Sequence, residues 1–275
     1  MIAQRSAGES LALHWREYLI EGWALGTFMV SAGVATTLLE YPGFWLHQAI
    51  ASPDLRRALI GIAMGLTAVA LIYSPWGQRS GAHMNPAVTL TFLRLGKIAR
   101  WDALFFVAAQ CLGGILGVLV VRALFADAFA LSPVRYIVTV PGPAGADVAF
   151  AAEVLISALL MATVLWVSGS PRFERATGLC AGILVALFIT FEAPLSGMSI
   201  NPARTLASAV PAGLFDHLWI YFIAPPLGML AAGEIYRRMR HGHEACAKLH
   251  HSLDRPCIHC GYEPALVRRA SSNPN

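Results

Sequence analysis

Six long apolar stretches, joined by short polar connections, constrain this chain more than any other feature of its sequence. A helix needs about 20 mainly apolar residues to cross a hydrocarbon core about 30 Å thick. The stretches cover residues of about 18–39, 57–76, 102–124, 148–168, 177–193 and 216–236. Only 13% of the 275 residues are charged, whereas a soluble domain carries about 25%. The sequence therefore predicts an all-α membrane protein with six transmembrane helices.

Two further apolar segments, residues 86–95 and 202–211, are too short to cross the membrane. Ten helical residues span about 15 Å, which is half of the hydrocarbon core. Backbone can end at this depth only where protein or a water-filled cavity covers it. We therefore expect two re-entrant half-helices.

The two short segments open with the same triplet, which indicates an internal duplication. The triplets lie 116 residues apart and consist of Asn85, Pro86, Ala87 and Asn201, Pro202, Ala203. A Leu-Gly pair in the following span also recurs, at Gly113 and Gly228, 115 residues apart. Three spans plus a half-helix per half place the halves in opposite orientations. The sequence thus predicts two inverted repeats, of about 16–125 and 147–240.

The repeated triplet favours a channel for small uncharged solutes. Proline at the first helical position, preceded by asparagine as N-cap, is a good helix start. Two half-helices entering from opposite faces would meet by their N-termini, each carrying about half a positive charge. Asn85 and Asn201 would then offer carboxamide N–H groups to a passing solute. A neutral molecule can accept these hydrogen bonds, whereas protons and cations are repelled.

Several polar residues within apolar segments are further candidates. Arg204 follows the second triplet, and an intramembrane charge is costly enough to indicate a role in the pore. Glu21 and Glu153 occupy the first span of each half; they could relay protons, but we favour bracing of the re-entrant loops by accepting backbone N–H bonds. His83 could face the pore or cap its loop.

Charge distribution orients the chain. If both termini are cytoplasmic, fifteen of the twenty Lys and Arg residues lie on the cytoplasmic side, as the positive-inside rule prefers. Arg56 and Arg57 oppose this orientation, because they open the second span on the outer face. We expect an integral protein of the plasma or inner membrane, with a cytoplasmic segment at 1–15, a channel domain at 16–240 and a cytoplasmic tail at 241–275.

The tail differs from the rest of the chain in its content of metal-binding residue types. The candidate ligands are Cys257 and Cys260, with Cys246, His250 or His251 as possible further ones. A structural zinc site needs four ligands, and a single Cys-x-x-Cys supplies two of them. Two hypotheses stay open: a soft-metal or redox sensor that gates the channel, and a flexible reduced tail, which we favour. We expect no cofactor.

Two other functional classes fit less well. A secondary transporter can also be built from inverted repeats and broken helices, but two asparagines and an arginine disfavour a cation site at the midplane. An enzyme is not expected, since the chain has neither a Gly-x-Ser-x-Gly nor a His-Glu-x-x-His motif. Nucleic acid is not an expected partner.

Over residues of about 15–240 the chain resembles the aquaporin, or major intrinsic protein, family. The resemblance rests on the two triplets, on Arg204, and on short motifs at Glu21-Gly22, Gly26-Thr27-Phe28, Gln110 and Gly113-Gly114. It implies a right-handed six-helix bundle with one pore per protomer, and a homotetramer. It also implies a constriction near the outer mouth, lined by Met64, Ile189, Met198 and Arg204.

The constriction and its neighbours give conflicting indications of the solute. Water-selective members of the family generally have an aromatic residue and a histidine where this chain has Met64 and Ile189. Glycerol-type members usually have an aspartate after the arginine and a basic residue four positions later, where this chain has Thr205 and Ala209. The pair Tyr221-Phe222 resembles water channels. Water is the favoured permeant; glycerol, urea or neutral metalloid hydroxides such as arsenous acid are the alternative.

Overall fold

A computed structural model describes residues 5–239, 246–251 and 257–262. Within these residues, six helices are long and apolar enough to cross a membrane. They form a bundle and comprise α1 (Ala7–Glu40), α3 (Pro53–Tyr73), α6 (Arg100–Phe125), α8 (Ala146–Ser168), α9 (Thr177–Phe191, preceded by the 3₁₀ turn Glu174–Ala176) and α12 (Leu218–Met239). Large apolar side chains such as Leu19, Leu112 and Phe191 are exposed on the outer surface, as a lipid-facing surface requires. The chain is an integral membrane protein with the predicted all-α fold.

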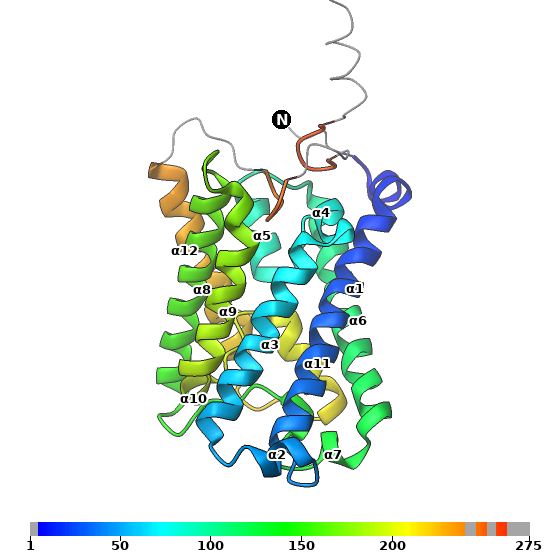
Figure 1. Ribbon diagram of the computed structural model, residues 1–275. Coiled ribbons are helices and arrows are strands. Elements are labelled where there is room, and N and C mark those ends of the chain that lie inside the picture. The colour runs from blue at the N-terminus through cyan, green and yellow to red at the C-terminus, as the bar shows by residue number, and fades with distance from the viewer. Residues whose placement is uncertain (1–4, 240–245, 252–256, 263–275) are drawn as a thin grey trace, which may run out of the picture.

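Two short helices enter this bundle from opposite ends (Figure 1). Helix α5 spans Pro86–Arg94 and α11 spans Pro202–Ala212. Each packs chiefly on the last long helix of the other repeat, α5 on α12 and α11 on α6. The pairs α1–α6 and α8–α12 make equivalent contacts in the two halves. The bundle therefore has the arrangement expected of two inverted repeats.

The two ends of the bundle carry different elements. One end, here called the tail end, holds the beginning of α1, the short helix α4 (Pro75–Ser80) and residues 246–251 and 257–262. The other, here called the loop end, holds α2 (Trp45–Ala49), α7 (Asp127–Ala130), the 3₁₀ turn Arg135–Ile137 and α10 (Ala193–Ser196). Residues 1–4, 240–245, 252–256 and 263–275 of the predicted terminal segments lie outside the described residues.

Most helix boundaries differ from the sequence prediction by a few residues, and two of the differences have an evident local cause. Helix α1 begins at Ala7, about one third of its length before the predicted start, because Ser6 and Glu9 form a capping box there. The second span ends at Tyr73, three residues earlier than predicted. Ser74 caps a new helix by accepting a hydrogen bond from the N–H of Gly77 at 2.9 Å, and Pro75 is its first residue. Pro75 therefore starts α4 and ends α3.

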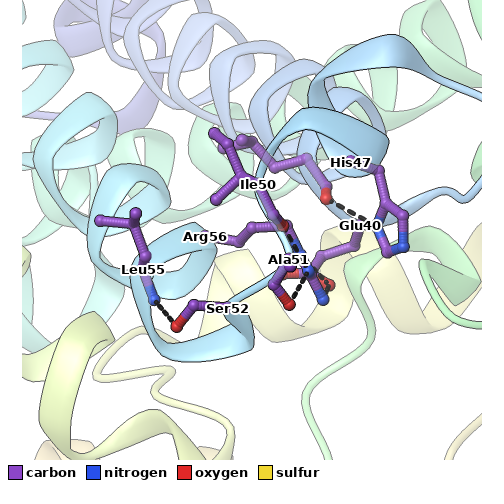
Figure 2. A network of polar contacts seen from close by, with 8 residues as sticks. Glu40, His47, Ile50, Ala51, Ser52, Leu55 and Arg56 are labelled. Atoms are coloured by element: carbon purple, nitrogen blue, oxygen red, sulfur yellow. Dashed lines mark hydrogen bonds and ion pairs between the residues drawn. The ribbon is translucent and has the colours of Figure 1, made fainter.

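Arg56, whose position opposes the positive-inside rule, forms hydrogen bonds with the connection between α1 and α3 (Figure 2). Its guanidinium donates to Glu40 Oε2 at 3.2 Å and to the carbonyl oxygens of Ile50 at 2.8 Å and Ala51 at 3.2 Å. The residue is 7% exposed. Its charge thus satisfies backbone carbonyls that would otherwise lack partners near the end of a span.

Glycines allow the first and third spans to lie against each other. A Cβ added at Gly113 would overlap the carbonyl oxygen of Gly22, and one at Gly117 would overlap that of Gly26. The second repeat uses the same device, because a Cβ at Gly228 in α12 would overlap the carbonyl oxygen of Val154 in α8. Small residues at such contacts let helix backbones approach closely in lipid.

Replacing Gly113 with valine should therefore push α6 away from α1. We expect Gly113→Val to lower the free energy of unfolding by about 3 kcal/mol or more, since overpacking against backbone cannot be relieved by a rotamer change. Thermal unfolding and size-exclusion chromatography in detergent would measure the loss. Gly8→Ala is the matched control, because nothing lies within 4 Å of a Cβ at Gly8. An unchanged melting temperature for Gly113→Val would contradict the close contact.

Candidate functional site

The N-termini of the two half-helices meet through their asparagines. Asn85 Oδ1 accepts the N–H of Ala87 at 2.8 Å, and its Nδ2 donates to the carbonyl oxygen of Ile200 at 2.7 Å. Asn201 Oδ1 accepts the N–H of Ala203 at 3.0 Å, and its Nδ2 donates to the carbonyl oxygen of Met84 at 2.7 Å. Each asparagine thus caps its own helix and binds the loop of the other. A carboxamide has two N–H groups, so each retains one beyond these bonds.

A buried glutamate holds each of the two loops that precede the half-helices. Glu153 accepts hydrogen bonds from Ser196 Oγ at 2.8 Å and from the N–H groups of Ser199 and Ile200 at 2.6 and 2.7 Å. Glu153 is fully buried. These bonds give partners to backbone N–H groups that lie outside any regular helix.

Glu21 plays the same part in the first repeat. It accepts from Ser80 Oγ at 2.7 Å and from the N–H groups of His83 and Met84 at 3.0 and 2.7 Å. Gln110 adds a fourth hydrogen bond to Glu21, at 2.9 Å. Both glutamates therefore accept hydrogen bonds from a serine hydroxyl and two backbone N–H groups of the loop before a half-helix.

The two loops share an unusual backbone conformation. Ala82 and Met84 have φ angles of 54° and 50°, and Met198 and Ile200 have φ angles of 49° and 49°. Positive φ is uncommon for residues with a Cβ, and such strain concentrates at functional sites. In both loops the residues with positive φ lie one and three positions before the asparagine. This backbone conformation is therefore part of the internal repeat.

One cavity of about 300 Å³ runs past both asparagines. Its wall includes the four residues of the predicted constriction, Met64, Ile189, Met198 and Arg204, together with His83. Most of the remaining wall is apolar, with contributions from Phe28, Ile60, Val88, Leu160, Val164 and Val185. Polar groups are thus confined to a few places along an apolar wall, which suits a ligand or solute that must be oriented and not held tightly.

Two arginines contribute to the cavity wall, and their guanidinium groups differ in their hydrogen-bond partners. Arg204 Nη1 is buried and has no hydrogen-bond partner among the described residues. Arg57, which sequence reasoning placed only on the outer face, also lines the cavity. Its Nε donates to the carbonyl oxygen of Thr190 at 2.8 Å and its Nη2 binds Asp54 at 2.6 Å. Arg204 therefore has a buried guanidinium nitrogen without a partner among the described residues, whereas two of the three guanidinium nitrogens of Arg57 are paired.

The aromatic pair that favoured water does not face the cavity. Tyr221 is fully buried and its hydroxyl donates to the carbonyl oxygen of Ser196 at 2.6 Å, supporting the second loop from behind. Phe222 is 42% exposed on the outer surface. Neither residue is part of the cavity wall. The indication of a water channel from this pair therefore rests on family resemblance and not on the cavity wall.

The tail reaches the cavity at the tail end. His83 Nε2 donates to the carbonyl oxygen of Ala247 at 2.9 Å, and the side chain of Leu249 forms part of the cavity wall. His259 Nε2 donates to the carbonyl oxygen of Ser80 at 2.8 Å. Burial, together with the neighbouring His83, lowers the pKa of His259 to about 4, so this ring is neutral at pH 7. A freely mobile tail was expected; residues 246–251 and 257–262 instead pack on the channel.

The three predicted tail cysteines lie together with one of the two candidate histidines. Cys246, Cys257 and Cys260 form a group with His251. His250 instead packs edge-on against Tyr73, with ring centroids 5.1 Å apart. Sequence spacing could not separate the adjacent histidines, because neither lies in a helix or strand that would set its direction.

Comparison with known proteins agrees with this geometry. Residues 9–236 match the family described as major intrinsic protein. The chain is 36% identical over 66% of its length to the aquaporin NIP4-1 of Arabidopsis thaliana, and it spans 62% of that relative. It is 34% identical over 82% of its length to glycerol uptake facilitator protein-like 6 of Lactiplantibacillus plantarum, of which it spans 98%.

A solved structure shares the fold. The X-ray structure of the aquaglyceroporin from Plasmodium falciparum superposes with a TM-score of 0.65, at 21% sequence identity, and covers 81% of this chain and 95% of that one. At this identity the likeness concerns the fold alone. The overall arrangement of helices is therefore shared with a solved structure.

Proposed function

The chain belongs to the major intrinsic protein family of membrane channels for water and small solutes, and we propose that its cavity is a pore for water and for small neutral solutes of the glycerol and urea class. The observation that carries the proposal is the set of side chains at the predicted constriction. Three are aliphatic, and Arg204 is the fourth. The arginine donates hydrogen bonds to the oxygen atoms of a polyol or of urea and so orients the solute. The apolar remainder of the wall accommodates the carbon skeleton, so the pore is not restricted to water.

The asparagines supply the donors at the middle of the pore. Each carboxamide is held by its helix cap and by the opposite loop, so its remaining N–H has a set direction. A solute oxygen that passes accepts one hydrogen bond from each side in turn. Because these donors are already fixed in position, little side-chain entropy is lost when the solute exchanges hydrogen bonds with water for hydrogen bonds with the asparagines.

Cation exclusion follows from the same elements. The N-termini of α5 and α11 each contribute about half a positive charge at the middle of the pore, and Arg204 adds a full charge toward the loop end. Hydroxonium and metal cations meet this field in a narrow, poorly solvated passage. A neutral solute does not.

We assign the tail end to the cytoplasm. Basic residues gather there in the connections between helices, namely Arg79, Arg94, Lys97, Arg100, Arg172 and Arg175, and positive connections stay on the cytoplasmic side. Arg56, at the loop end, is neutralised by Glu40. The membrane is then the plasma or inner membrane, and the family resemblance favours a homotetramer with one pore per protomer.

Stopped-flow light scattering on proteoliposomes tests the proposal. Vesicles with the purified chain should shrink faster than protein-free vesicles in a sucrose gradient. In glycerol, urea or arsenous acid gradients they should also re-swell faster, with weak temperature dependence and no saturation. Fast shrinkage without faster re-swelling would restrict the pore to water. Saturable, strongly temperature-dependent flux would favour a transporter.

A further inference from the structure

Four thiol and imidazole groups at the tail end form a cluster that the channel function does not use. Cys246, His251, Cys257 and Cys260 each offer one ligand atom, and these atoms all lie within 4.8 Å of one another. The Sγ atoms of Cys246 and Cys257 are 3.5 Å apart, and His251 Nε2 is 3.3 Å from Cys260 Sγ. All three cysteines are free thiols.

Two of these separations, 3.5 and 3.3 Å, fall within the range of a tetrahedral metal site, and the others lie within 4.8 Å. Zinc binds sulfur at about 2.3 Å and imidazole nitrogen at about 2.0–2.1 Å, so ligand atoms on a tetrahedron lie about 3.3–3.8 Å apart. Three cysteines and one histidine are a structural zinc set, and soft thiolates favour Zn²⁺ over Mg²⁺ or Ca²⁺. The four atoms need only small shifts to meet this geometry.

The local backbone presents the ligands to one point. Residues 257–262 form a closed turn, in which the N–H of Gly261 donates to the carbonyl oxygen of Cys257 at 2.9 Å and the N–H of Cys257 to that of Tyr262 at 2.8 Å. Gly261 has a φ of 70°, a conformation that a residue with a Cβ rarely adopts. The ring of Tyr262 packs edge-on against His251, with centroids 5.8 Å apart. The turn therefore brings both thiols of the Cys-x-x-Cys to one side, beside the imidazole.

The same two short segments carry the contacts that cover the end of the cavity. Ala247 accepts from His83, the N–H of Leu249 donates to the carbonyl oxygen of Gly81 at 3.1 Å, and Lys248 Nζ donates to the carbonyl oxygen of Gln78 at 2.9 Å. Ala247, Lys248 and Leu249 are 0%, 2% and 6% exposed. Leu249 belongs to the cavity wall. The candidate ligands thus flank the residues that sit in the mouth of the cavity.

We propose that Cys246, His251, Cys257 and Cys260 bind one Zn²⁺ per chain, and that this ion holds the tail in the cytoplasmic mouth so that the channel is closed when zinc is bound. Neither segment forms a helix or strand of its own. Short segments without their own core gain a fixed fold from a structural metal. Loss of the ion removes the link between the segments, and Leu249 then leaves the cavity wall. The gating half of this inference rests on the proposed channel function.

Zinc binding is measured first, on the reduced, metal-stripped full-length chain in detergent. Titration of Zn²⁺ against a chromophoric chelator should show one tight equivalent per chain. Cys257→Ser should weaken that binding by more than about 100-fold, since loss of a ligand exceeds the effect of losing a supporting residue. Cys260→Ser, at an exposed thiol, is a second variant should the first misfold. The control is the double variant Cys111→Ser, Cys180→Ser, whose thiols lie outside the cluster.

Flux is then measured on full-length chain in proteoliposomes, with Zn²⁺ or chelator on both faces. Chelated wild type should conduct severalfold faster than zinc-loaded wild type, and Cys257→Ser should conduct fast under both conditions. The Cys111, Cys180 double variant should respond like wild type. Conduction in any of these states establishes the channel independently of the zinc titration.

Each alternative result contradicts a named part of the proposal. Absence of a tight equivalent, or its retention in Cys257→Ser, overturns the zinc site. A disulfide found by mass spectrometry in the protein as isolated, with no zinc bound after reduction, replaces the metal with a redox pair. One zinc bound with identical flux in zinc and chelator overturns the closure. No flux in any state overturns the proposed channel and leaves the zinc result standing.

Discussion

Proteoliposomes with Arg204→Val are expected to conduct monovalent cations and to pass glycerol and urea severalfold faster than wild type. A cation that passes about 4 Å from a guanidinium meets a repulsion of about 4 kcal/mol at an effective dielectric constant of 20. That barrier corresponds to about a thousandfold in rate. Valine removes the charge and widens the passage, while the half-helix N-termini keep part of the exclusion. Solute flux by light scattering and cation flux by a potential-sensitive dye measure the two effects.

The control for Arg204→Val is Arg122→Val, in chelator-treated vesicles so that the tail is in the same state throughout. Arg122 also lies in an apolar helix, but it pairs with Asp127 and is not part of the cavity wall. It should leave both fluxes unchanged. Ion-tight vesicles and unaltered solute flux for Arg204→Val would place the constriction elsewhere along the cavity.

Glu153→Leu is expected to prevent the chain from reaching a stable fold. The substitution leaves the N–H groups of Ser199 and Ile200 and the hydroxyl of Ser196 without their acceptor. Each buried unpaired group costs about 1–3 kcal/mol, so the sum of about 3–9 kcal/mol approaches the whole stability of about 5–15 kcal/mol. Size-exclusion chromatography and thermal unfolding in detergent would detect the loss.

Glu153→Gln separates bracing from proton transfer. The amide keeps one oxygen acceptor and the volume of the side chain, so this variant should fold with reduced thermal stability and retain solute flux. Glu234→Gln is the control, because Glu234 forms ion pairs with Arg94 and Arg237 at the surface and should change stability little. A Glu153→Gln variant that folds normally but loses flux would instead support a direct role for the carboxylate in transport.

Local chemistry explains why the half-helices could be predicted from sequence. Both begin at the proline that follows the asparagine, since the cap bond joins an asparagine oxygen to an N–H two residues later. Family resemblance placed Met64, Ile189, Met198 and Arg204 at a constriction, and all four line one cavity. Their roles at a constriction remain a proposal.

The sequence by itself determined the six apolar spans, the two half-helix starts and the positions of the buried glutamates, because these follow from local periodicity, capping and repeat spacing. Only the tertiary structure decided that Tyr221 faces the loop and not the cavity, that Arg57 reaches the cavity wall, and that His251, not His250, joins Cys246, Cys257 and Cys260. These outcomes depend on the rotation of each helix about its axis and on contacts between residues far apart in the chain. A pattern of residue types specifies neither, since both are set by how the helices and the tail pack together.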